Sequence, residues 1–412
     1  MRHFKTGTCA RLDCRSIDFS KMIEQKPDAD ALPFSFRNTA LPKEQLSCYI
    51  THTNEKTHKI ILKNLNRSPL YTGKIKARGV RYCPSLEDKV VKFKDHDRHQ
   101  IFIEPAGRNT VEVYPNGIST SLPFDVQLDF IHTIEGLENA KILRPGYGIE
   151  HGLVDAKELY PTLESKKISG LYFAGQVNGT TGYEEAAAQG IVAGINAALK
   201  IKDEKPFILG RKDAFIGVLI DDLTAKGTDE PYRMFTSRSE FRLSLRETNA
   251  ATRLVPLAYE LGLLQKEDLE LVLKKKAEIE KTVQQLQATK IIMAAKRLSL
   301  FEILKRPTQD FNAIEKYLGT KIEDKIIKIE AEINAKYEGF LQREEIWLKE
   351  LKHLERIKIP KLDFSKIPSL SKEVIEKLQK FAPASLAEAL AISGITPAAI
   401  LTVYNFIKKG RK

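Results

Sequence analysis

The pattern of apolar and polar positions changes near residue 210. Before it, short runs rich in β-branched and aromatic residues are separated by glycine, proline and other turn residues, a pattern typical of strands. The predicted strands are HKIILKNL, ARGVRYCPS, HQIFIEP, TVEVYP, KILRPGYGI and GLYFAG. A helix is expected over SLPFDVQLDFIHTI, with Ser121 as its cap and Pro123 in its first turn. We therefore predict an α/β fold for this half.

After residue 211, apolar residues recur every three or four positions, which indicates amphipathic helices. We predict helices over ATRLVPLAYELGLL and KEDLELVLKKKAEIEKTVQQLQ, and one long helix over EDKIIKIEAEINAKYEGFLQREEIWLKELKHLERI. The segment IPKLDFSKIPSL is predicted as a linker to a compact helical tail. This half is expected to be all-α.

Composition narrows the class of protein. The 412 residues carry 66 Lys and Arg against 54 Asp and Glu, and 42% of positions are hydrophobic, which is ordinary globular usage. The sequence has no run of about 18 uncharged apolar residues, so we expect a soluble cytoplasmic or organellar protein without membrane contact. The sequence has four cysteines, Cys9, Cys14, Cys48 and Cys83. They are widely spaced and form no CxxC pair, which argues against a structural zinc site and against a disulfide framework.

The segment 170–199 carries the clearest chemical signal. A buried strand, Leu171 to Ala174, is predicted to enter a glycine-rich turn and then an alanine-rich helix. Such a turn lets backbone N–H groups approach a ligand closely, and the helix N-terminus adds a positive partial charge. Gly190 and Gly194 are four positions apart, so we expect a strip without side chains that packs against a sheet.

The turn and helix resemble the second flavin-contacting motif of flavoproteins with two dinucleotide-binding domains. More narrowly, NGTTGYEEAAAQG is similar to the MnmG (GidA) family, which modifies the wobble uridine of certain tRNAs. The resemblance runs through essentially the whole chain in the family's order, in FKTGTCARLD, CYITHTNEKTH, LNRSPLYTG, RYCPSLEDKV, YPNGISTSLP, RPGYGIE, EPYRMFTSRSEFRL, KYEGF and SGITPAAI.

The resemblance implies a partial FAD-binding Rossmann-like domain with an inserted NAD-binding domain, followed by an all-α region. The expected domains are a remnant of the FAD-binding domain over 1–45, the NAD-binding insertion over 46–110, the rest of the FAD-binding domain over 111–210, a helical tRNA- or partner-binding domain over 211–357, and a C-terminal helical domain over 358–412. The implied reaction adds a carboxymethylaminomethyl or aminomethyl group at carbon 5 of uridine. It depends on FAD, NADH and methylenetetrahydrofolate, and on a GTPase partner, and the enzyme is a homodimer.

The resemblance also assigns cofactor residues. Gln176 is expected to contact the flavin, together with the turn residues Gly175, Asn178, Gly179, Thr180 and Gly182. Thr181 is a further candidate donor. The stretch from 79 to 93 is expected to bind the nicotinamide dinucleotide through Gly79, Arg81, Lys89 and Phe93.

Cys83 is the candidate nucleophile. A thiolate is an effective nucleophile when neighbouring cations lower its pKa, and Arg81 and Lys89 are candidates for that effect. Addition of a thiolate to carbon 6 of uracil would make carbon 5 nucleophilic. The alternative is a buried strand cysteine. Cys48 is the weaker candidate, and His52 and His58 are predicted to be polar structural residues rather than metal ligands.

An arginine series is the candidate RNA-binding surface. Four arginines recur at spacings of four to five and would form one basic stripe on a helix: Arg233, Arg238, Arg242 and Arg246. The alternative is a solvated face with salt bridges to Glu240 and Glu247.

The chain departs from the family pattern in two places. It contains no GxGxxG motif for the flavin pyrophosphate, so we expect a truncated gene product or fragment. Cys9 and Ala10 stand where the family favours two prolines. Two other functions therefore stay open. One is a flavin- and folate-dependent tRNA uracil methyltransferase, against which the long helical region argues. The other is a non-catalytic fragment that binds tRNA or a partner.

Overall fold

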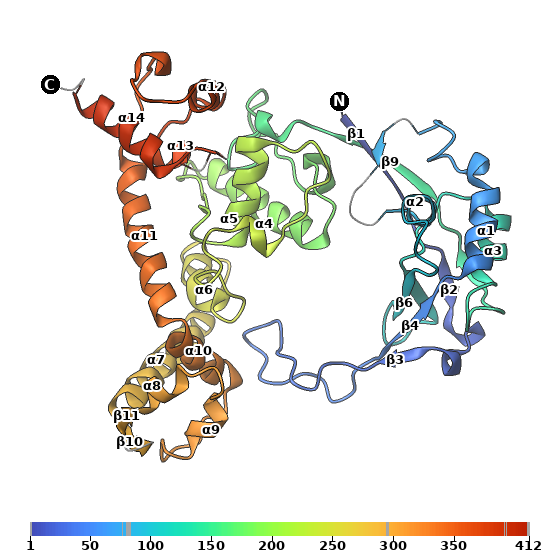
Figure 1. The fold of residues 1–412 in the computed structure, drawn as a ribbon, viewed down its shortest axis with the longest axis horizontal. Helices are drawn as coiled ribbons and strands as arrows, with labels where there is room; N and C mark the ends of the chain where they lie inside the picture. The colour runs from blue at the N-terminus through green and yellow to red at the C-terminus, as the bar shows by residue number, and fades with distance from the viewer. Residues whose placement is uncertain are drawn as a thin grey trace. The chain divides into compact units, whose positions relative to one another are not determined.

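The computed structural model describes residues 2–75, 77–79, 84–293, 296–390, 392 and 394–409 (Figure 1). The described chain forms two compact units. The first unit contains residues 1–208 and 219–235, and the second contains 209–218 and 236–412. The first is mixed α/β and the second is mainly helical, which confirms the predicted fold class.

A six-stranded antiparallel sheet organises the first unit, in the order β3-β4-β6-β7-β2-β8. Its strands are β2 (Arg11–Asp13), β3 (Ile23–Gln25), β4 (Cys48–His52), β6 (Gln100–Pro105), β7 (Glu112–Asn116) and β8 (Ile142–Arg144). In a second sheet, β1 (Arg2–Gly7) pairs parallel with β5 (Arg78–Gly79) and antiparallel with β9 (Gly148–Leu153). The larger sheet takes strands from each of the first three expected domains, so those limits stay predictions.

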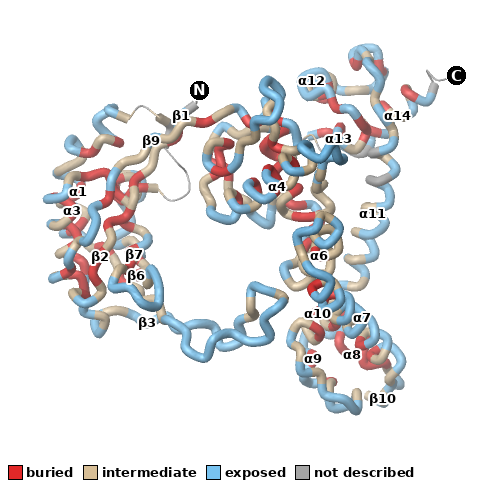
Figure 2. The backbone as a smooth tube through the Cα atoms, turned by 180° about the vertical axis from the view of Figure 1, so that it is seen from behind, coloured by how far each residue is buried: buried red, intermediate tan, exposed pale blue. Residues whose placement is uncertain are grey.

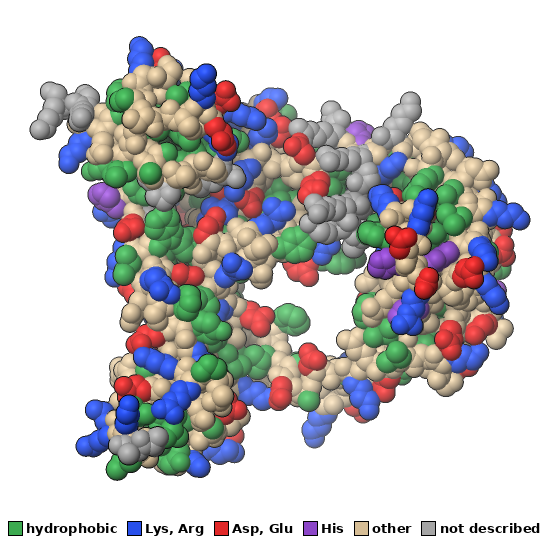
Figure 3. Space-filling model, viewed as in Figure 1, with side chains coloured by type: hydrophobic (Ala, Val, Ile, Leu, Met, Phe, Trp, Pro, Cys, Tyr) green, Lys and Arg blue, Asp and Glu red, His purple; other side chains and the backbone are tan. Residues whose placement is uncertain are grey.

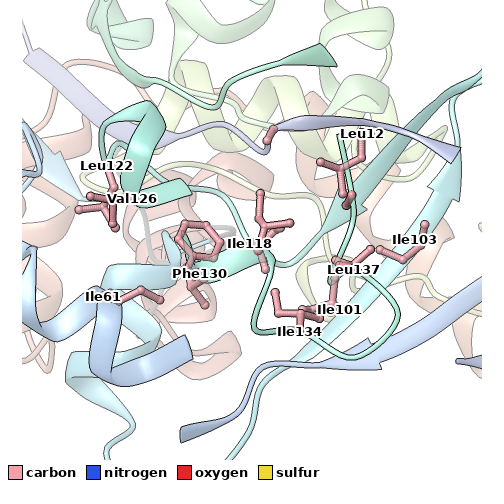
Figure 4. Close-up of a cluster of buried hydrophobic side chains, with 14 of the residues drawn as sticks. Leu12, Ile61, Ile101, Ile103, Ile118, Leu122, Val126, Phe130, Ile134 and Leu137 are labelled. Atoms are coloured by element: carbon pink, nitrogen blue, oxygen red, sulfur yellow. The ribbon is translucent and has the colours of Figure 1, made fainter. Parts of the chain in front are cut away.

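The main core of this unit lies between the six-stranded sheet and two helices, α1 (Glu55–Lys63) and α3 (Phe124–Ile131). These helices lie side by side (Figure 1). Leu12, Ile101 and Ile103 on the strands and Ile61 and Phe130 on the helices are fully buried in one cluster (Figure 4). Each such side chain stabilises the fold by about 1.5–3 kcal/mol, so the cluster fixes both helices on the sheet.

The strand predicted over HKIILKNL is wrong, because residues 58–63 belong to α1 and the last two residues follow its end. The side chain of Asn54 accepts a hydrogen bond from the Thr57 N–H at 3.1 Å, and the Thr57 hydroxyl accepts one from the Asn54 N–H at 3.2 Å. This reciprocal cap starts a helix. Thr57 and Ile61, four apart, then share its buried face.

Two further local predictions are wrong. Pro123, rather than Ser121, is the N-cap of α3, and the Ser121 hydroxyl instead lies 2.6 Å from that of Ser68. The run KILRPGYGI forms two strands rather than one, β8 and β9, because Pro145 lies between them and has no N–H for a strand ladder.

The second unit has two hydrophobic clusters, each enclosed by helices. The first involves α7 (Lys266–Ala288), α8 (Leu300–Leu304), α9 (Phe311–Glu315) and α10 (Lys325–Lys336), beside the hairpin of β10 (Lys290–Met293) and β11 (Lys296–Ser299). The second involves α12 (Lys372–Phe381), α13 (Leu386–Leu390) and α14 (Pro397–Lys409). The other helices of this unit are α6 (Ala250–Glu260), which precedes α7, and α11 (Glu338–Arg356). Helix α5 (Phe215–Asp221) begins in this unit, and its last three residues belong to the first unit.

The predicted long helix is two helices, because the backbone leaves helical geometry at Tyr337, where α10 ends and α11 begins. No described side chain of α11 is buried (Figure 2). No helix in the described part of the chain is long and apolar enough to cross a membrane.

His99, the residue before β6, predicts that the stability of the first unit falls at acidic pH. Burial, followed by the charges of His58, Lys89 and His96, lowers the pKa of His99 to about 4. Folding therefore favours the neutral ring. The stabilisation is present above a pH of about 6.5 and is lost as the pH falls toward about 4, by about 1–2 kcal/mol after allowance for solvent screening.

We expect His99→Phe to flatten the pH dependence of the unfolding temperature between pH 7.5 and 5, measured by calorimetry. His353→Phe in the second unit is the control and should leave the wild-type slope unchanged. Equal slopes in wild type and His99→Phe would contradict the prediction.

Candidate functional site

The glycine-rich turn has the geometry that its sequence predicts, but the strand before it is absent. Residues 175–178 form one turn of 3-10 helix, and Gly175 and Gly179 have φ of 87° and 91°, in the region that favours glycine. Helix α4 (Tyr183–Ile201) then begins after Gly182. In 171–174, only Tyr172 forms a bridge, to Glu164. An extended segment becomes a strand only where a neighbour pairs along it, and no described strand does so here.

Gln189, on the inner face of α4, holds the turn in place. Its Oε1 accepts hydrogen bonds from the Gly175 N–H at 3.2 Å and from Asn178 Nδ2 at 2.8 Å, and its Nε2 donates to Thr180 Oγ1 at 3.0 Å. Gln189, Asn178 and Thr180 are all buried. Asn178 and Thr180, expected to contact the cofactor, therefore use the Asn178 amide nitrogen and the Thr180 hydroxyl inside the protein, whereas Asn178 Oδ1 is buried without a hydrogen-bond partner among the described residues.

Gln176 differs from its neighbours because its side chain is exposed. In the described part of the chain, the side-chain amide of Gln176 forms no hydrogen bond. The adjacent N-terminus of α4 has no side-chain cap, so its first-turn N–H groups and positive dipole end stay available. An exposed amide beside an uncapped helix start fits the ribityl and ring end of a flavin.

Glu185, in the first turn of α4, was not singled out from the sequence. Its carboxylate is 4% exposed, and Oε1 accepts a hydrogen bond from the Met234 N–H at 2.7 Å and lies 3.8 Å from Arg233 Nε. A Cβ at residue 182 would come within 1.7 Å of Oε2, so a side chain there would displace this carboxylate from its present position. Glu185 thus joins the turn to the segment that carries Arg233. The only sequence signal for this role was the pair Glu184–Glu185, and two acidic residues at this point are equally typical of the first turn of a helix.

The outer face of α4 does not pack as expected. A Cβ added at Gly190 or Gly194 would meet nothing within 4 Å, so the prediction that this strip packs against a sheet is wrong for the described residues. The buried face of α4 instead carries Val192, Ala193 and Asn196, besides Glu185 and Gln189.

The expected nicotinamide site is only partly described. Arg81 and Cys83 lie outside the described residues. Gly79 pairs with Lys5 of β1. Lys89, on α2 (Leu86–Lys92), donates to the Gly117 carbonyl at 2.8 Å, and Phe93 is 49% exposed at the end of that helix.

The predicted basic stripe on a helix is wrong. Between 231 and 249 the only helical element is the 3-10 turn Thr236–Arg238. The N–H groups of Leu243 and Ser244 donate to the Glu344 carboxylate, at 3.4 and 2.9 Å, rather than to preceding carbonyls. Arg233 belongs to the first unit and Arg238, Arg242 and Arg246 to the second.

The four arginines also differ in what they contact. Arg246 forms a buried ion pair with Glu330 at 2.5 Å, whereas Arg242 is exposed. Glu240 pairs with Arg211 at 2.8 Å. Basic and acidic side chains alternate over the visible face of the second unit (Figure 3), so its basic groups form no continuous stripe there.

Comparison with known proteins decides the family. Residues 1–205 match the family model described as glucose inhibited division protein A. Residues 266–345 and 348–412 match the C-terminal helical domain and the C-terminal helical bundle of the tRNA-modifying enzyme MnmG/GidA. The tRNA uridine 5-carboxymethylaminomethyl modification enzyme MnmG of Thermodesulfovibrio yellowstonii is 50% identical over 99% of this chain and 68% of its own length. The chain belongs to the MnmG/GidA family.

Other MnmG/GidA proteins agree with this result. The MnmG of Borrelia garinii is 49% identical over 98% of this chain and 67% of its own length. Two crystal forms of Aquifex aeolicus GidA, 47% and 49% identical, superpose with TM-scores of 0.84 over 98% of this chain. The chain spans about two thirds of the length of these relatives. The match of the helical domains identifies a tRNA uridine-modifying enzyme family and removes the methyltransferase alternative.

Gln189 on α4 and Gln176 in the turn should respond differently to substitution. Gln189→Leu leaves buried donors and acceptors of the turn unpaired, so the local free energy of unfolding should fall by about 2–4 kcal/mol. Gln176→Leu, at an exposed position, should change it by less than about 0.5 kcal/mol. Hydrogen–deuterium exchange of peptides covering 173–190 measures both. Equal exchange in the two variants would refute the assignment of Gln189 as the support of the turn.

Proposed function

We propose that this chain acts in the addition of a carboxymethylaminomethyl or aminomethyl group to carbon 5 of the tRNA wobble uridine. The reaction uses FAD, NADH and methylenetetrahydrofolate. The observation that carries the proposal is the glycine turn of an MnmG/GidA protein, with Gln176 exposed beside the uncapped start of α4.

Cys83 is the proposed nucleophile. Its thiolate adds to carbon 6 of the uracil ring, and the electrons of the C5–C6 double bond move onto the carbonyl oxygen at carbon 4. Carbon 5 is then the nucleophile that bonds to the methylene carbon of methylenetetrahydrofolate, and one carbon–nitrogen bond of the folate breaks with its electron pair left on that nitrogen. Glycine or ammonium then displaces the second folate nitrogen at this carbon, which releases tetrahydrofolate. Loss of the carbon 5 proton expels the thiolate and restores the double bond. Arg81 and Lys89 are proposed to favour the thiolate and to bind the nicotinamide dinucleotide with Gly79 and Phe93.

The turn and α4 are proposed to hold and tune the flavin. Gln176 donates or accepts a hydrogen bond through its exposed amide. The N–H groups at the start of α4, near Gly182 and Tyr183, would stabilise negative charge on a reduced flavin. Gly175, Asn178, Gly179 and Thr180 support this geometry from inside. When bound, the flavin supplies reducing equivalents that come from NADH.

The proposed macromolecular partners are tRNA, a GTPase and a second copy of the chain, in the cytoplasm. Arg242, exposed in the second unit, and Arg233 and Arg238 are proposed phosphate contacts. Arg246 is proposed to assist RNA binding indirectly, by holding neighbouring residues in place, because its own charge is paired with Glu330.

The test is complementation in bacteria that lack their own gene of this family. The chain is expressed, total tRNA is digested, and nucleosides are measured by mass spectrometry. We expect modified uridine with the wild-type chain and less than a tenth of it with Gln176→Ala. Unmodified uridine despite normal amounts of the chain and of the host GTPase would refute the enzymatic proposal. Retained tRNA binding in that case would favour the non-catalytic alternative.

A further inference from the structure

The second unit contains a pocket of about 450 Å³ next to the start of α6. Phe215, Leu245 and Leu254 form apolar walls, and Arg242 and Arg253 add guanidinium groups. Every residue that lines it belongs to the second unit. A volume of several hundred Å³, apolar walls and a few polar groups are typical of a small-ligand site.

Carboxylates balance only part of the positive charge at this pocket: Arg246 on the lining is paired with Glu330, whereas Arg253 forms its hydrogen bonds with uncharged groups. Arg253 Nε donates to Asn249 Oδ1 at 2.8 Å, and its terminal nitrogens donate to the backbone carbonyls of Arg246 and Asp213. Burial, followed by the charge of Arg246, lowers the pKa of Arg253. In the described part of the chain, neither Arg242 nor Arg253 forms an ion pair. Glu247, also on the lining, supplies one opposing charge.

We infer that this pocket takes a single unpaired nucleotide of RNA, with its base against the wall of Phe215 and its phosphate at Arg242 and Arg253. Guanidinium groups match phosphate geometry. Proteins read single-stranded RNA by splaying bases out of the stack onto apolar or aromatic surfaces. The identity of the ligand rests on the proposed function, because a tRNA substrate brings unpaired loop nucleotides. The pocket itself stands on its own geometry.

Two alanines at the start of α6 make a matched test. Ala250 lines the pocket and Ala251 does not. Ala250→Leu fills the pocket without a change of charge, whereas Ala251→Leu adds the same volume outside it. Binding of the 412-residue chain to labelled tRNA and to labelled pentauridylate is measured by fluorescence anisotropy at several salt concentrations, and circular dichroism checks that each variant folds.

We expect Ala250→Leu to weaken binding of both RNAs about tenfold with an unchanged salt dependence, and Ala251→Leu to stay within twofold of wild type. Arg242→Gln should weaken binding and lower the salt slope by about 0.7–0.9. Glu247→Gln, which removes the opposing charge, should strengthen it. Uridine 5′-monophosphate should displace pentauridylate more strongly than inorganic phosphate does.

Wild-type affinity in Ala250→Leu would overturn the nucleotide pocket even if tRNA binding, and with it the proposed function, holds. Binding of pentauridylate that depends on Ala250, without binding of tRNA, would support the pocket and count against the proposed function. Displacement by methylenetetrahydrofolate and not by uridine 5′-monophosphate would also overturn the inference, because the pocket would then hold the one-carbon donor.

Discussion

Cys83→Ser is expected to reduce uridine modification by on the order of a thousandfold or more, while leaving tRNA binding and the unfolding temperature near their wild-type values. Removal of a nucleophile eliminates the covalent route, and losses of this size are typical when a covalent catalyst is removed. A serine hydroxyl, which stays protonated near neutral pH, is a poor substitute for a thiolate. The measurement is the initial rate of nucleoside formation at saturating cofactors.

A second readout tests the covalent step directly. If Cys83 adds to carbon 6, tRNA carrying 5-fluorouridine at the wobble position should form a stable adduct, because the fluorine at carbon 5 cannot leave as a proton does. Mass spectrometry of the digested adduct should identify the peptide that contains Cys83. Cys48→Ser is the matched control. The Cys48 thiol is half-buried, burial and then Glu104 raise its pKa, and its loss should leave both adduct and rate unchanged. An adduct at Cys48 would reverse the assignment.

The elements predicted correctly are those whose local pattern and tertiary environment agree. The strands β6 and β7 alternate β-branched residues between turn residues, and α4, α6 and α7 repeat apolar residues at helical spacing. The segment HKIILKNL failed because its β-branched content favoured a strand, whereas the cap formed by Asn54 and Thr57 decided for a helix. A cap made by only two side chains contributes little to a sequence pattern, but it fixes the backbone of the first helical turn.

In the candidate site too, features set by local backbone geometry were predictable and features set by tertiary contacts were not. Glycines in the turn at 175–182 were predictable because few other residues allow its positive φ angles. The support by Gln189 and Glu185 was not, because polar residues on a helix are usually solvated, and only the folded chain reveals that this face is buried. The arginine series failed for a related reason. A spacing of four to five fits a helix, but Glu344, far along the chain, binds the backbone that a helix would need.

Glu330→Gln is expected to lower the free energy of unfolding of the second unit by about 3 kcal/mol, since it leaves the buried charge of Arg246 without its partner. The Arg246 side chain is 15% exposed and that of Glu330 is 5% exposed. Both Glu330 oxygens accept from the guanidinium, at 3.2 and 2.5 Å. Trp347 on α11, the single tryptophan of the chain, lies in this unit, so its fluorescence during urea unfolding reports the change.

Glu345→Gln is the control for this experiment. Glu345 pairs with Lys349 at 2.8 Å on the exposed side of α11, and solvent and salt screen such a pair, so the urea midpoint should not move. The double variant Arg246→Met with Glu330→Gln should recover much of the loss, because no unpaired charge then remains. Equal midpoints for wild type and Glu330→Gln would mean that Arg246 is solvated rather than paired. Arg246 would then join Arg242 as a direct phosphate contact, and its substitution should lower the salt slope of tRNA binding instead of the stability of the fold.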